Sequence, residues 1–328
     1  MFERILVPLD GSPRAEQALP VAARLAHASG GSIHILQVLN LVVPYDSGGL
    51  APISFASEQS VEMEIAQATD YLDTIAASSV LTGIHTTTEA LFGHPAQSIL
   101  ATAKSRGIDL IVLCSHGRTG FMRWTLGSVA HTLAHESTVS TLVLPESEPA
   151  SLLSNTDPAR PLYALVPLDG SELAEAALVP AAHLVTALAA SAPGVLHLAQ
   201  VVKIFPATAE EGFVSELNEE AVQRAKTYLA QVTERLQATT KDFKLSLTSS
   251  VELEKDVSSA LLHLTEHGGE EKEAEGIGRC NLIAISTHGR SGLERWVMGS
   301  VTERLLTSTK LPMLIVRPPK KRVPTVAE

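Results

Sequence analysis

The sequence carries one pattern twice, and this repeat constrains the fold more than any other feature. Residues 116–120 read His-Gly-Arg-Thr-Gly, and residues 288–292 read His-Gly-Arg-Ser-Gly. In each copy nine residues separate the first glycine of this segment from a Gly-Ser pair, at 127–128 or at 299–300. A repeat of this spacing predicts two domains of the same fold in one chain.

A second repeat opens each half. Residues 5–12 read Ile-Leu-Val-Pro-Leu-Asp-Gly-Ser, and residues 164–171 read Ala-Leu-Val-Pro-Leu-Asp-Gly-Ser. The apolar run predicts a short strand that ends at Asp-Gly. Ser12 suits a helix N-cap and Pro13 suits the first turn, so we expect one helix that runs to about Ala28.

Further apolar runs alternate with amphipathic stretches in both copies. The later strands predicted from them are 32–39, 84–91, 110–114 and 141–145, and then 194–202, 243–253, 282–286 and 312–317. The later helices are 57–80, 95–105, 209–238 and 256–266, with one more after each glycine loop. Strands that alternate with helices predict an α/β fold. We expect two Rossmann-like, doubly wound domains, each with a five-stranded, mostly parallel sheet covered on both faces.

The repeats also set the expected domain boundaries. We predict a first domain over 1–146, a linker over 147–161 that is rich in Ser, Pro, Asn and Asp, and a second domain over 162–318. The second copy contains an acidic, Gly-rich insertion at about 267–278, which we interpret as a solvated loop. Residues 319–328 form the expected tail.

Charge and cysteine content exclude several classes of partner and environment. The 328 residues carry a formal net charge of −11, which argues against a nucleic-acid footprint, because that needs a clustered basic surface. The two cysteines, Cys114 and Cys280, lie at unmatched places in the repeats, which fits a reducing compartment. We expect a cytoplasmic protein with no export signal and no membrane span.

Three features of each copy meet at one edge of the predicted sheet. Asp10, Val38 and the loop at Gly117 each follow or end a predicted strand of the first copy. The matching residues of the second copy are Asp169, Val201 and Gly289. Ligands of doubly wound sheets bind outside the carboxyl ends of the strands. We therefore predict one binding crevice per domain.

The residues of the glycine loops suit a phosphate. Glycine lets backbone N–H groups approach an anion closely, and a Gly-Ser pair before a helix places amides and a hydroxyl at the positive end of the helix dipole. Alternatively, Ser128 and Ser300 merely cap their helices. Arg118 and Arg290 follow the loop glycines and either neutralise phosphate charge or stay in solvent.

The two Val-Pro-Leu-Asp-Gly-Ser stretches and the two glycine loops resemble the universal stress protein family in its tandem two-domain form. The resemblance covers nearly the whole chain except the linker, the insertion and the tail. ATP-binding members carry the motif Gly-x2-Gly-x9-Gly-Ser/Thr, and both copies keep its second and third glycines and its serine. The first glycine is replaced by Cys114 and by Ser286, and both side chains are small.

The resemblance implies that the chain binds ATP, with Mg²⁺ accompanying the phosphates. Asp10 and Asp169 are then expected to contact the nucleoside, and the backbones of Val38 and Val201 to read adenine. The nucleotide-contacting residues that the resemblance implies are Pro8, Asp10, Val38, Cys114, Gly117, Arg118, Gly127, Ser128 and Val129, followed by Pro167, Asp169, Val201, Ser286, Gly289, Arg290, Gly299, Ser300 and Val301.

The second copy departs from the pattern at one further place. Residues 93–96 read Gly-His-Pro-Ala in the first copy, whereas residues 254–257 read Glu-Lys-Asp-Val. Acidic charge beside a polyphosphate weakens its binding if it faces the site. We therefore expect the first site to bind nucleotide more tightly than the second.

The resemblance implies a stress-response sensor or switch without efficient catalysis, and we assign no catalytic residue. One alternative is a nucleotide-independent protein-interaction module whose glycine loops are only turns. Another is a slow ATPase or an autophosphorylating protein. We assign no metal site of the protein's own, because His131 and His135 are four residues apart on a predicted helix but no third ligand is evident in the sequence.

The resemblance also suggests how the domains and chains assemble. The last strand of each copy is apolar enough to need covering, and we expect the two domains to pack through these strands as a pseudo-dimer. Two chains are expected to assemble further into a homodimer.

Overall fold

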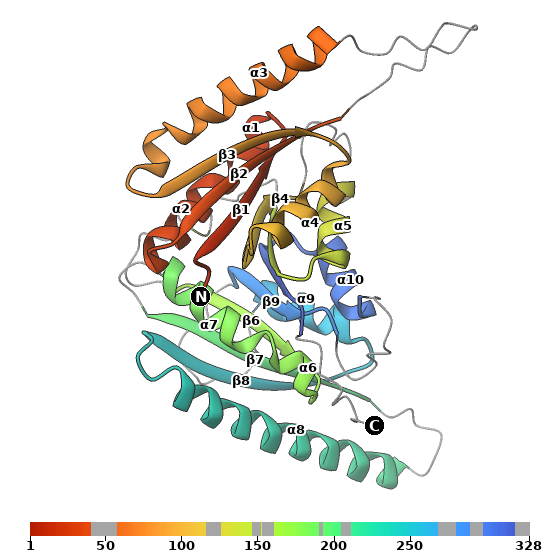
Figure 1. Cartoon of the computed structure of the whole chain (residues 1–328). Helices are drawn as coiled ribbons and strands as arrows, with labels where there is room; N and C mark the ends of the chain where they lie inside the picture. Colours follow the sequence, from red (N-terminus) through yellow and green to blue (C-terminus); the bar gives the residue numbers. More distant parts are fainter. Residues whose placement is uncertain are drawn as a thin grey trace, which may run out of the picture. The chain divides into compact units, whose positions relative to one another are not determined.

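The structure is a computed structural model of the chain, and it describes residues 1–40, 58–115, 126–145, 152, 161–189, 193–204, 211–267, 280–288 and 298–318. The chain divides into two compact units, one built mainly from residues 1–158 and the other mainly from residues 159–328 (Figure 1). Most of the linker, the acidic insertion and the tail lie outside the described residues.

The first domain is a parallel sheet whose strands alternate with helices. Its elements are β1 (Arg4–Leu9), α1 (Pro13–Glu16), α2 (Ala18–Ser29), β2 (Ser32–Leu39), α3 (Glu58–Ala76), the short 3-10 helix η1 (Ser79–Leu81), β3 (His85–Phe92), α4 (Pro95–Ser105), β4 (Leu110–Cys114), α5 (Ser128–Glu136) and β5 (Ser140–Leu144). The strand order is β3-β2-β1-β4-β5. All four of these pairings are parallel.

The helices cover both faces of this sheet. Right-handed crossovers place α2 and α3 on one face, because their connections run from β1 toward β3, and place α4 and α5 on the other. In agreement, α3 packs on β2 and β3, and α4 packs on α5 (Figure 1). The predicted α/β fold with a mostly parallel sheet is therefore confirmed for the first domain.

The second domain repeats this arrangement. Its elements are β6 (Tyr163–Leu168), α6 (Glu172–Glu175), α7 (Leu178–Leu188), β7 (Gly194–Lys203), α8 (Glu211–Thr239), β8 (Leu245–Glu254), α9 (Val257–His267), β9 (Leu282–Ser286), α10 (Ser300–Ser308) and β10 (Met313–Val316). Its strand order is β8-β7-β6-β9-β10, and β6 pairs with β7 and β9 in parallel, as β7 does with β8.

The start of the first helix differs from the prediction in one respect. Ser12 is the N-cap, and its hydroxyl accepts a hydrogen bond of 3.2 Å from the Ala15 amide, as expected. The single helix to Ala28 is wrong, however, because the chain breaks at Gln17 into α1 and α2. Pro20 explains the break, since proline is tolerated in a first turn but its ring clashes with the carbonyl four residues earlier inside a longer helix.

Each sheet contains one buried histidine on its second strand. The ring of His34 lies 2.8 Å from the Thr87 hydroxyl and 3.1 Å from a Glu89 carboxylate oxygen. The ring of His197 lies 2.9 Å from the hydroxyl of Thr248 and 2.9 Å from that of Ser250. Both rings are thus held between their own strand and the edge strand beside it.

The tight entry into β2 gives a testable prediction about stability. A Cβ on Gly31 would lie 2.5 Å from the carbonyl oxygen of Glu3, which accepts the first hydrogen bond of β2 from the Ser32 amide. We expect Gly31→Ala to lower the free energy of unfolding by about 2 kcal/mol, because backbone must move to admit the methyl group. Urea titration followed by circular dichroism measures this loss.

The neighbouring glycine is the matched control. Gly30 has a φ of +66°, and a Cβ added there would meet only open space, so Gly30→Ala carries only the strain of the left-handed conformation, about 1 kcal/mol. An equal loss in the two variants would contradict the close approach of Gly31 to Glu3.

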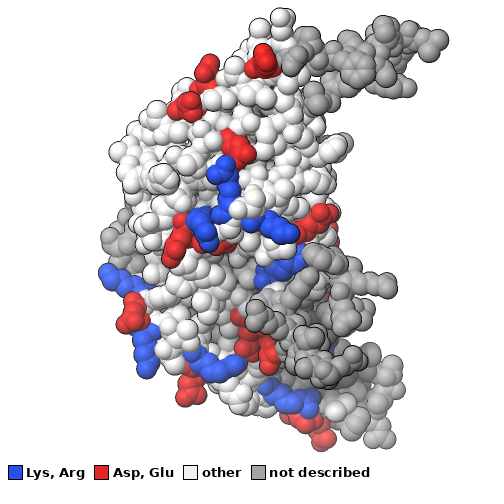
Figure 2. All heavy atoms as spheres, in the orientation of Figure 1, with Lys and Arg blue, Asp and Glu red and all other residues white. Residues whose placement is uncertain are grey.

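The face of the molecule drawn in Figure 2 carries charges of both signs. Figure 2 shows Lys and Arg side chains interspersed with Asp and Glu over the face in view. In the described part of the chain, no helix has both the length and the apolar character needed to cross a bilayer.

Candidate functional site

A cavity of about 690 Å³ lies at the carboxyl edge of the first-domain sheet. It reaches the ends of β1, β2 and β4, the inner side of α3, and the first turns of α4 and α5. Among the predicted site residues, those that line it are Pro8, Asp10, Val38, Cys114, Gly127, Ser128 and Val129. The structure therefore brings together in one cavity all the described first-domain residues of the predicted set.

The sheet edge divides this cavity into two sides. Side chains alternate between the faces of a strand, so Leu36 and Val38 share the face of His34, whereas Gln37 lies on the opposite face. The α4 side is the face of His34, because Glu89, which contacts His34, also accepts a hydrogen bond from Arg106 at the end of α4. Gln37 accordingly lies on the face that α3 covers.

The two sides differ in chemistry. We call the α4 side the apolar wall, and it consists of Leu36, Val38, Pro95, Ile99 and Leu113. We call the α3 side the polar wall, and it consists of Asp10, Gln37, Glu64, Gln67 and Tyr71. A ligand of this cavity must therefore offer an apolar surface to one side and hydrogen-bonding groups to the other.

The turn after β1 fixes the carboxylate of Asp10. Its Oδ1 accepts hydrogen bonds from the backbone amide of Ser12 at 3.0 Å and from the Ser12 hydroxyl at 2.6 Å. Gly11 permits this turn with a φ of +79°, a backbone value that residues with a side chain rarely adopt. The second domain repeats the arrangement, with Asp169 Oδ1 accepting from the Ser171 amide at 3.0 Å and from its hydroxyl at 2.6 Å.

The glycine before each late helix closes its loop against the sheet. The Gly127 amide donates to the Ser115 carbonyl at 2.8 Å, and the Gly299 amide donates to the Thr287 carbonyl at 2.9 Å. This bond holds the N-terminus of α5, or of α10, at the end of the neighbouring strand. The first amides of a helix have no partner within the helix. Together with the positive end of the helix dipole, they favour a negatively charged group at this edge of the sheet.

The alternative in which the two serines cap their helices is wrong. The N-cap residues are Gly127 and Gly299, and neither end has a side-chain cap hydrogen bond. Ser128 and Ser300 are instead the first residues of α5 and α10, and both are exposed. Their hydroxyls thus stand at the helix start without a capping role.

A tyrosine on α3 completes the polar wall, and no local sequence pattern indicates it. The Tyr71 hydroxyl donates a hydrogen bond of 2.9 Å to a carboxylate oxygen of Glu16 on α1. Burial, and then the negative charge of Glu16, raise the pKa of Tyr71 far above its ordinary value. Tyr71 therefore keeps its proton at neutral pH, and the hydrogen bond ties α3 to the turn that carries Asp10.

Cys114 stands where the family motif has its first glycine. It lines the cavity, and burial together with the nearby charge of Asp10 raises the pKa of its thiol to about 12. The neutral thiol adds no negative charge beside a phosphate. Ser286 at the matching place of the second domain is only 4% exposed, and its Oγ lies 3.5 Å from the His288 amide that donates to it.

The second domain holds its predicted residues at corresponding strand and helix ends. Pro167 lies in β6, Asp169 just after it, Val201 in β7, Ser286 at the end of β9, and Gly299, Ser300 and Val301 at the start of α10. Four predicted residues lie outside the described residues, namely Gly117, Arg118, Gly289 and Arg290.

One ion pair distinguishes the second domain at this edge. Asp256 caps α9 by accepting a 2.7 Å hydrogen bond from the Ser259 amide, and its other oxygen accepts one of 2.7 Å from Arg304 on α10. These hydrogen bonds and the Arg304 charge hold the pKa of Asp256 below its ordinary value. In the first domain His94 precedes α4 at the place of Asp256 and Thr132 stands at the place of Arg304, so no matching carboxylate–guanidinium pair can form there.

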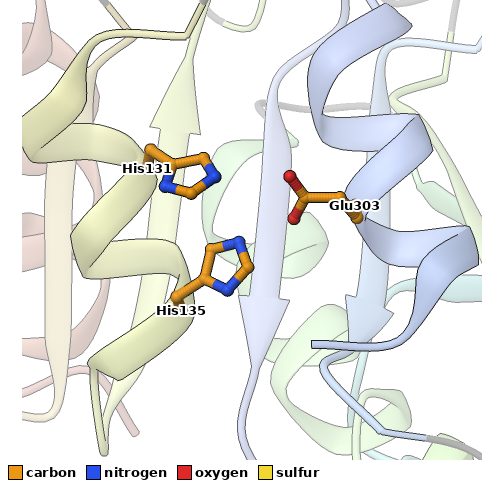
Figure 3. A group of neighbouring side chains, drawn as sticks. All are labelled: His131, His135 and Glu303. Carbon is orange, nitrogen blue, oxygen red and sulfur yellow. The ribbon is translucent and has the colours of Figure 1, made fainter. Parts of the chain in front are cut away.

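The two histidines singled out in the sequence lie together on one helix. Figure 3 shows His131 and His135 on α5, and their ring centroids are 4.3 Å apart. Figure 3 also draws Glu303, which stands at the position of α10 that matches His131 in the repeat.

Comparisons with known proteins support the family resemblance. The model of the Universal stress protein family matches residues 1–145 and again residues 164–317. A universal stress protein of Mycolicibacterium smegmatis is 25% identical over 321 residues, which cover 96% of this chain and 97% of that protein. Universal stress protein YxiE of Bacillus subtilis is 32% identical over 149 residues, which cover 44% of this chain and 99% of the relative.

A solved structure shows the same fold over the whole length. The universal stress protein of Archaeoglobus fulgidus superposes with a TM-score of 0.62 at 20% identity, covering 97% of this chain and 99% of that one. Two matches to one family model, placed on two domains with one strand order, establish the duplication at the level of structure. The chain belongs to the universal stress protein family and is a tandem, two-domain member of it.

Proposed function

We propose that the chain binds an adenine nucleotide, with ATP as the preferred ligand, in the cavity of the first domain. Nucleotide occupancy would then serve as a stress-response sensor or switch. One observation carries the proposal. The apolar wall and the start of α5 line the same cavity of about 690 Å³. Cavities of about 300–1,000 Å³ are typical of small-ligand sites.

Each part of a nucleotide has a matching surface in this cavity. The apolar wall, with Pro95 and Ile99, suits the flat faces of a purine. The amides at Ser128 and Val129 begin α5, where the helix dipole favours phosphate. Asp10 lines the same cavity and can accept hydrogen bonds from the nucleoside.

The charge of the cavity favours the Mg²⁺ complex of ATP. Among the described residues that line it, none is Lys or Arg, whereas Asp10 and Glu64 are both acidic. A bare triphosphate would bring negative charge toward these carboxylates. We expect ATP to bind at least about tenfold more weakly when EDTA replaces Mg²⁺, and calorimetric titration in both buffers measures the difference.

The proposal does not extend to efficient catalysis. Phosphoryl transfer needs a positioned base together with cationic groups that stabilise the leaving phosphate. The described lining residues include no cationic side chain. Slow hydrolysis is the alternative outcome, and phosphate release from Mg²⁺-ATP over hours would reveal it.

The first experiment is a binding measurement on the whole chain. Protein stripped of ligand is titrated with ATP, ADP and AMP, and any nucleotide that co-purifies is identified after denaturation. Micromolar ATP binding at one or two sites per chain supports the proposal. No heat and no change in Tm up to millimolar ATP would sink it, and would favour the nucleotide-independent interaction module.

The second domain and the assembly carry weaker proposals. Its site holds the same turn at Asp169, but the Asp256–Arg304 pair links α9 to α10 at the edge where α4 and α5 line the first cavity. We therefore propose that the first site fills before the second. The pseudo-dimer of domains and the homodimer of chains stay predictions.

A further inference from the structure

Helix α5 of the first domain carries two imidazole rings on one side. His131 and His135 are four residues apart, a spacing that places two side chains on one face of a helix, one turn from each other. Their ring centroids are 4.3 Å apart, the ring planes are inclined by 31°, and neither residue is buried. Figure 3 shows both rings projecting from the same side of α5. The two rings are therefore close neighbours that an ion from solvent can reach.

The geometry of this pair suits a chelated metal ion. Each ring offers one nitrogen as a ligand, and the two nitrogens lie within 4.8 Å of each other. A transition-metal ion such as Zn²⁺ binds an imidazole nitrogen at about 2.0–2.1 Å, so two such ligands of one ion lie about 3 Å apart. Rotation about the side-chain bonds of the two histidines closes the difference. Two histidines at positions i and i+4 of a helix are also the pair that zinc metalloproteases present to their metal.

The shared fold does not require these two side chains. Helix α5 packs through Ala130, Leu133 and Ala134, which are its buried residues. In α10 the positions that match the two histidines hold Glu303 and Thr307, and the Thr307 hydroxyl donates a 3.0 Å hydrogen bond to the backbone carbonyl of Glu303. The same helix thus forms in the second domain without an imidazole pair. The pair is a feature of the first domain alone, which predicts one such site per chain.

We propose that His131 and His135 bind one divalent transition-metal ion, with water completing its coordination. Imidazole nitrogen suits Zn²⁺, Cu²⁺ and Ni²⁺, whereas Mg²⁺ and Ca²⁺ take oxygen ligands. The site differs from that of the Mg²⁺ expected with ATP, because neither histidine is among the residues that line the cavity. It revises the expectation from the sequence that the chain has no metal site of its own. It does not depend on nucleotide binding.

The test titrates the whole chain, stripped of nucleotide and metal, with Zn²⁺ alone by calorimetry. One imidazole holds an ion far more weakly than two that chelate it, so His131→Gln and His135→Gln should each weaken binding at this site at least about tenfold. Glutamine is at least as good a helix former as histidine, so α5 is kept. The control is His85→Gln/His94→Gln, which removes two exposed imidazoles of the same domain and should bind Zn²⁺ as wild type does.

The outcome is read as the number of Zn²⁺ ions bound as well as the affinity. The disappearance of one binding event from both α5 variants, with the control unchanged, supports the inference. A Zn²⁺ isotherm that wild type shares with His131→Gln/His135→Gln overturns it, because the ion would then bind elsewhere. The absence of Zn²⁺ binding by wild type overturns it as well. Neither result bears on ATP, which is tested separately.

Metal preference and thermal stability give a second readout, which holds even if a substitution changes the basal Tm. Ions held by imidazoles should bind in the order Co²⁺, Ni²⁺, Cu²⁺ of increasing affinity, and millimolar Mg²⁺ should not compete. Zn²⁺ at about ten times its Kd should raise the Tm of wild type and of the control by about 3 °C, but not that of either α5 variant. A rise that persists in the double variant, or a site that Mg²⁺ fills as readily as Zn²⁺, contradicts the inference.

Discussion

Alanine in place of Gly127 and Gly299 is expected to weaken ATP binding about a hundredfold while leaving the fold intact. Neither glycine is needed for its conformation, because φ is −61° at Gly127 and −64° at Gly299, values that any residue adopts. A Cβ on Gly299 would meet its nearest atom, the Thr287 carbonyl oxygen, at an ordinary 3.5 Å. Room for a methyl group therefore exists at Gly299 in the unliganded fold.

The same methyl group would stand in the path of a phosphate. Both glycines are N-caps, and an anion at the helix start approaches the backbone at this place. Displacing it forfeits about two charge-assisted hydrogen bonds, each worth about 1.5 kcal/mol, which together correspond to the hundredfold loss. Calorimetric titration of Gly127→Ala/Gly299→Ala with Mg²⁺-ATP gives the affinity, and thermal melting gives the stability.

Ser128→Ala is the matched control for this prediction. It removes a hydroxyl from the same helix start but keeps every amide, so we expect a loss of only about threefold to tenfold. A folded double glycine variant with wild-type affinity would show that α5 and α10 do not bind the phosphates.

The second large effect is a loss of stability in acid that arises from His197. Burial lowers the pKa of this histidine from 6.5 to about 4, and the residue is only 2% exposed. The folded protein therefore binds its proton more weakly than the unfolded chain does. The stabilisation is complete above pH 6.5, and about 3 kcal/mol of it is lost as the pH falls toward 4.

The pH dependence of urea unfolding tests this prediction. In His197→Gln, the difference in unfolding free energy between pH 7 and pH 4.5 should shrink by about 2 kcal/mol, because the group that titrates is gone. His34 and Glu89 contribute acid sensitivity of the same sign, since the pKa of each is lowered in the first domain, and they remain in the variant. His85→Gln removes an exposed histidine and should keep the wild-type pH dependence. If both variants respond to pH alike, the buried ring is not the cause.

Much of the fold followed from the sequence, because local patterns determine it. Residues 32–39, 95–105 and 110–114 form the predicted elements with the predicted bounds, since apolar runs and Pro or Ser at helix starts mark them directly. The break at Gln17 was missed, although Pro20 signals it, because the apolar spacing continues across the break.

The candidate site was predicted only where it depends on strand ends. The repeat indicated Asp10, Val38 and Gly127, and these line one cavity. Tyr71 could not be found this way, because its contact with Glu16 joins two helices whose mutual position no local pattern encodes. Gln37 did carry a signal, a polar residue inside an apolar strand that recurs as Gln200, but its place in the polar wall becomes visible only once the strand is packed.

The hydrogen bond from the Gly127 amide to the Ser115 carbonyl holds the two ends of the intervening segment together at the end of β4. Both ends are pinned to the sheet by one backbone contact, and Gly299 and Thr287 provide the same contact in the second domain. The entropy of closing such a loop grows only slowly with its length. Exchange of residues 116–126 with 288–298, eleven residues in each case, should therefore leave both domains folded, because each chain end meets the same backbone contact in its new place.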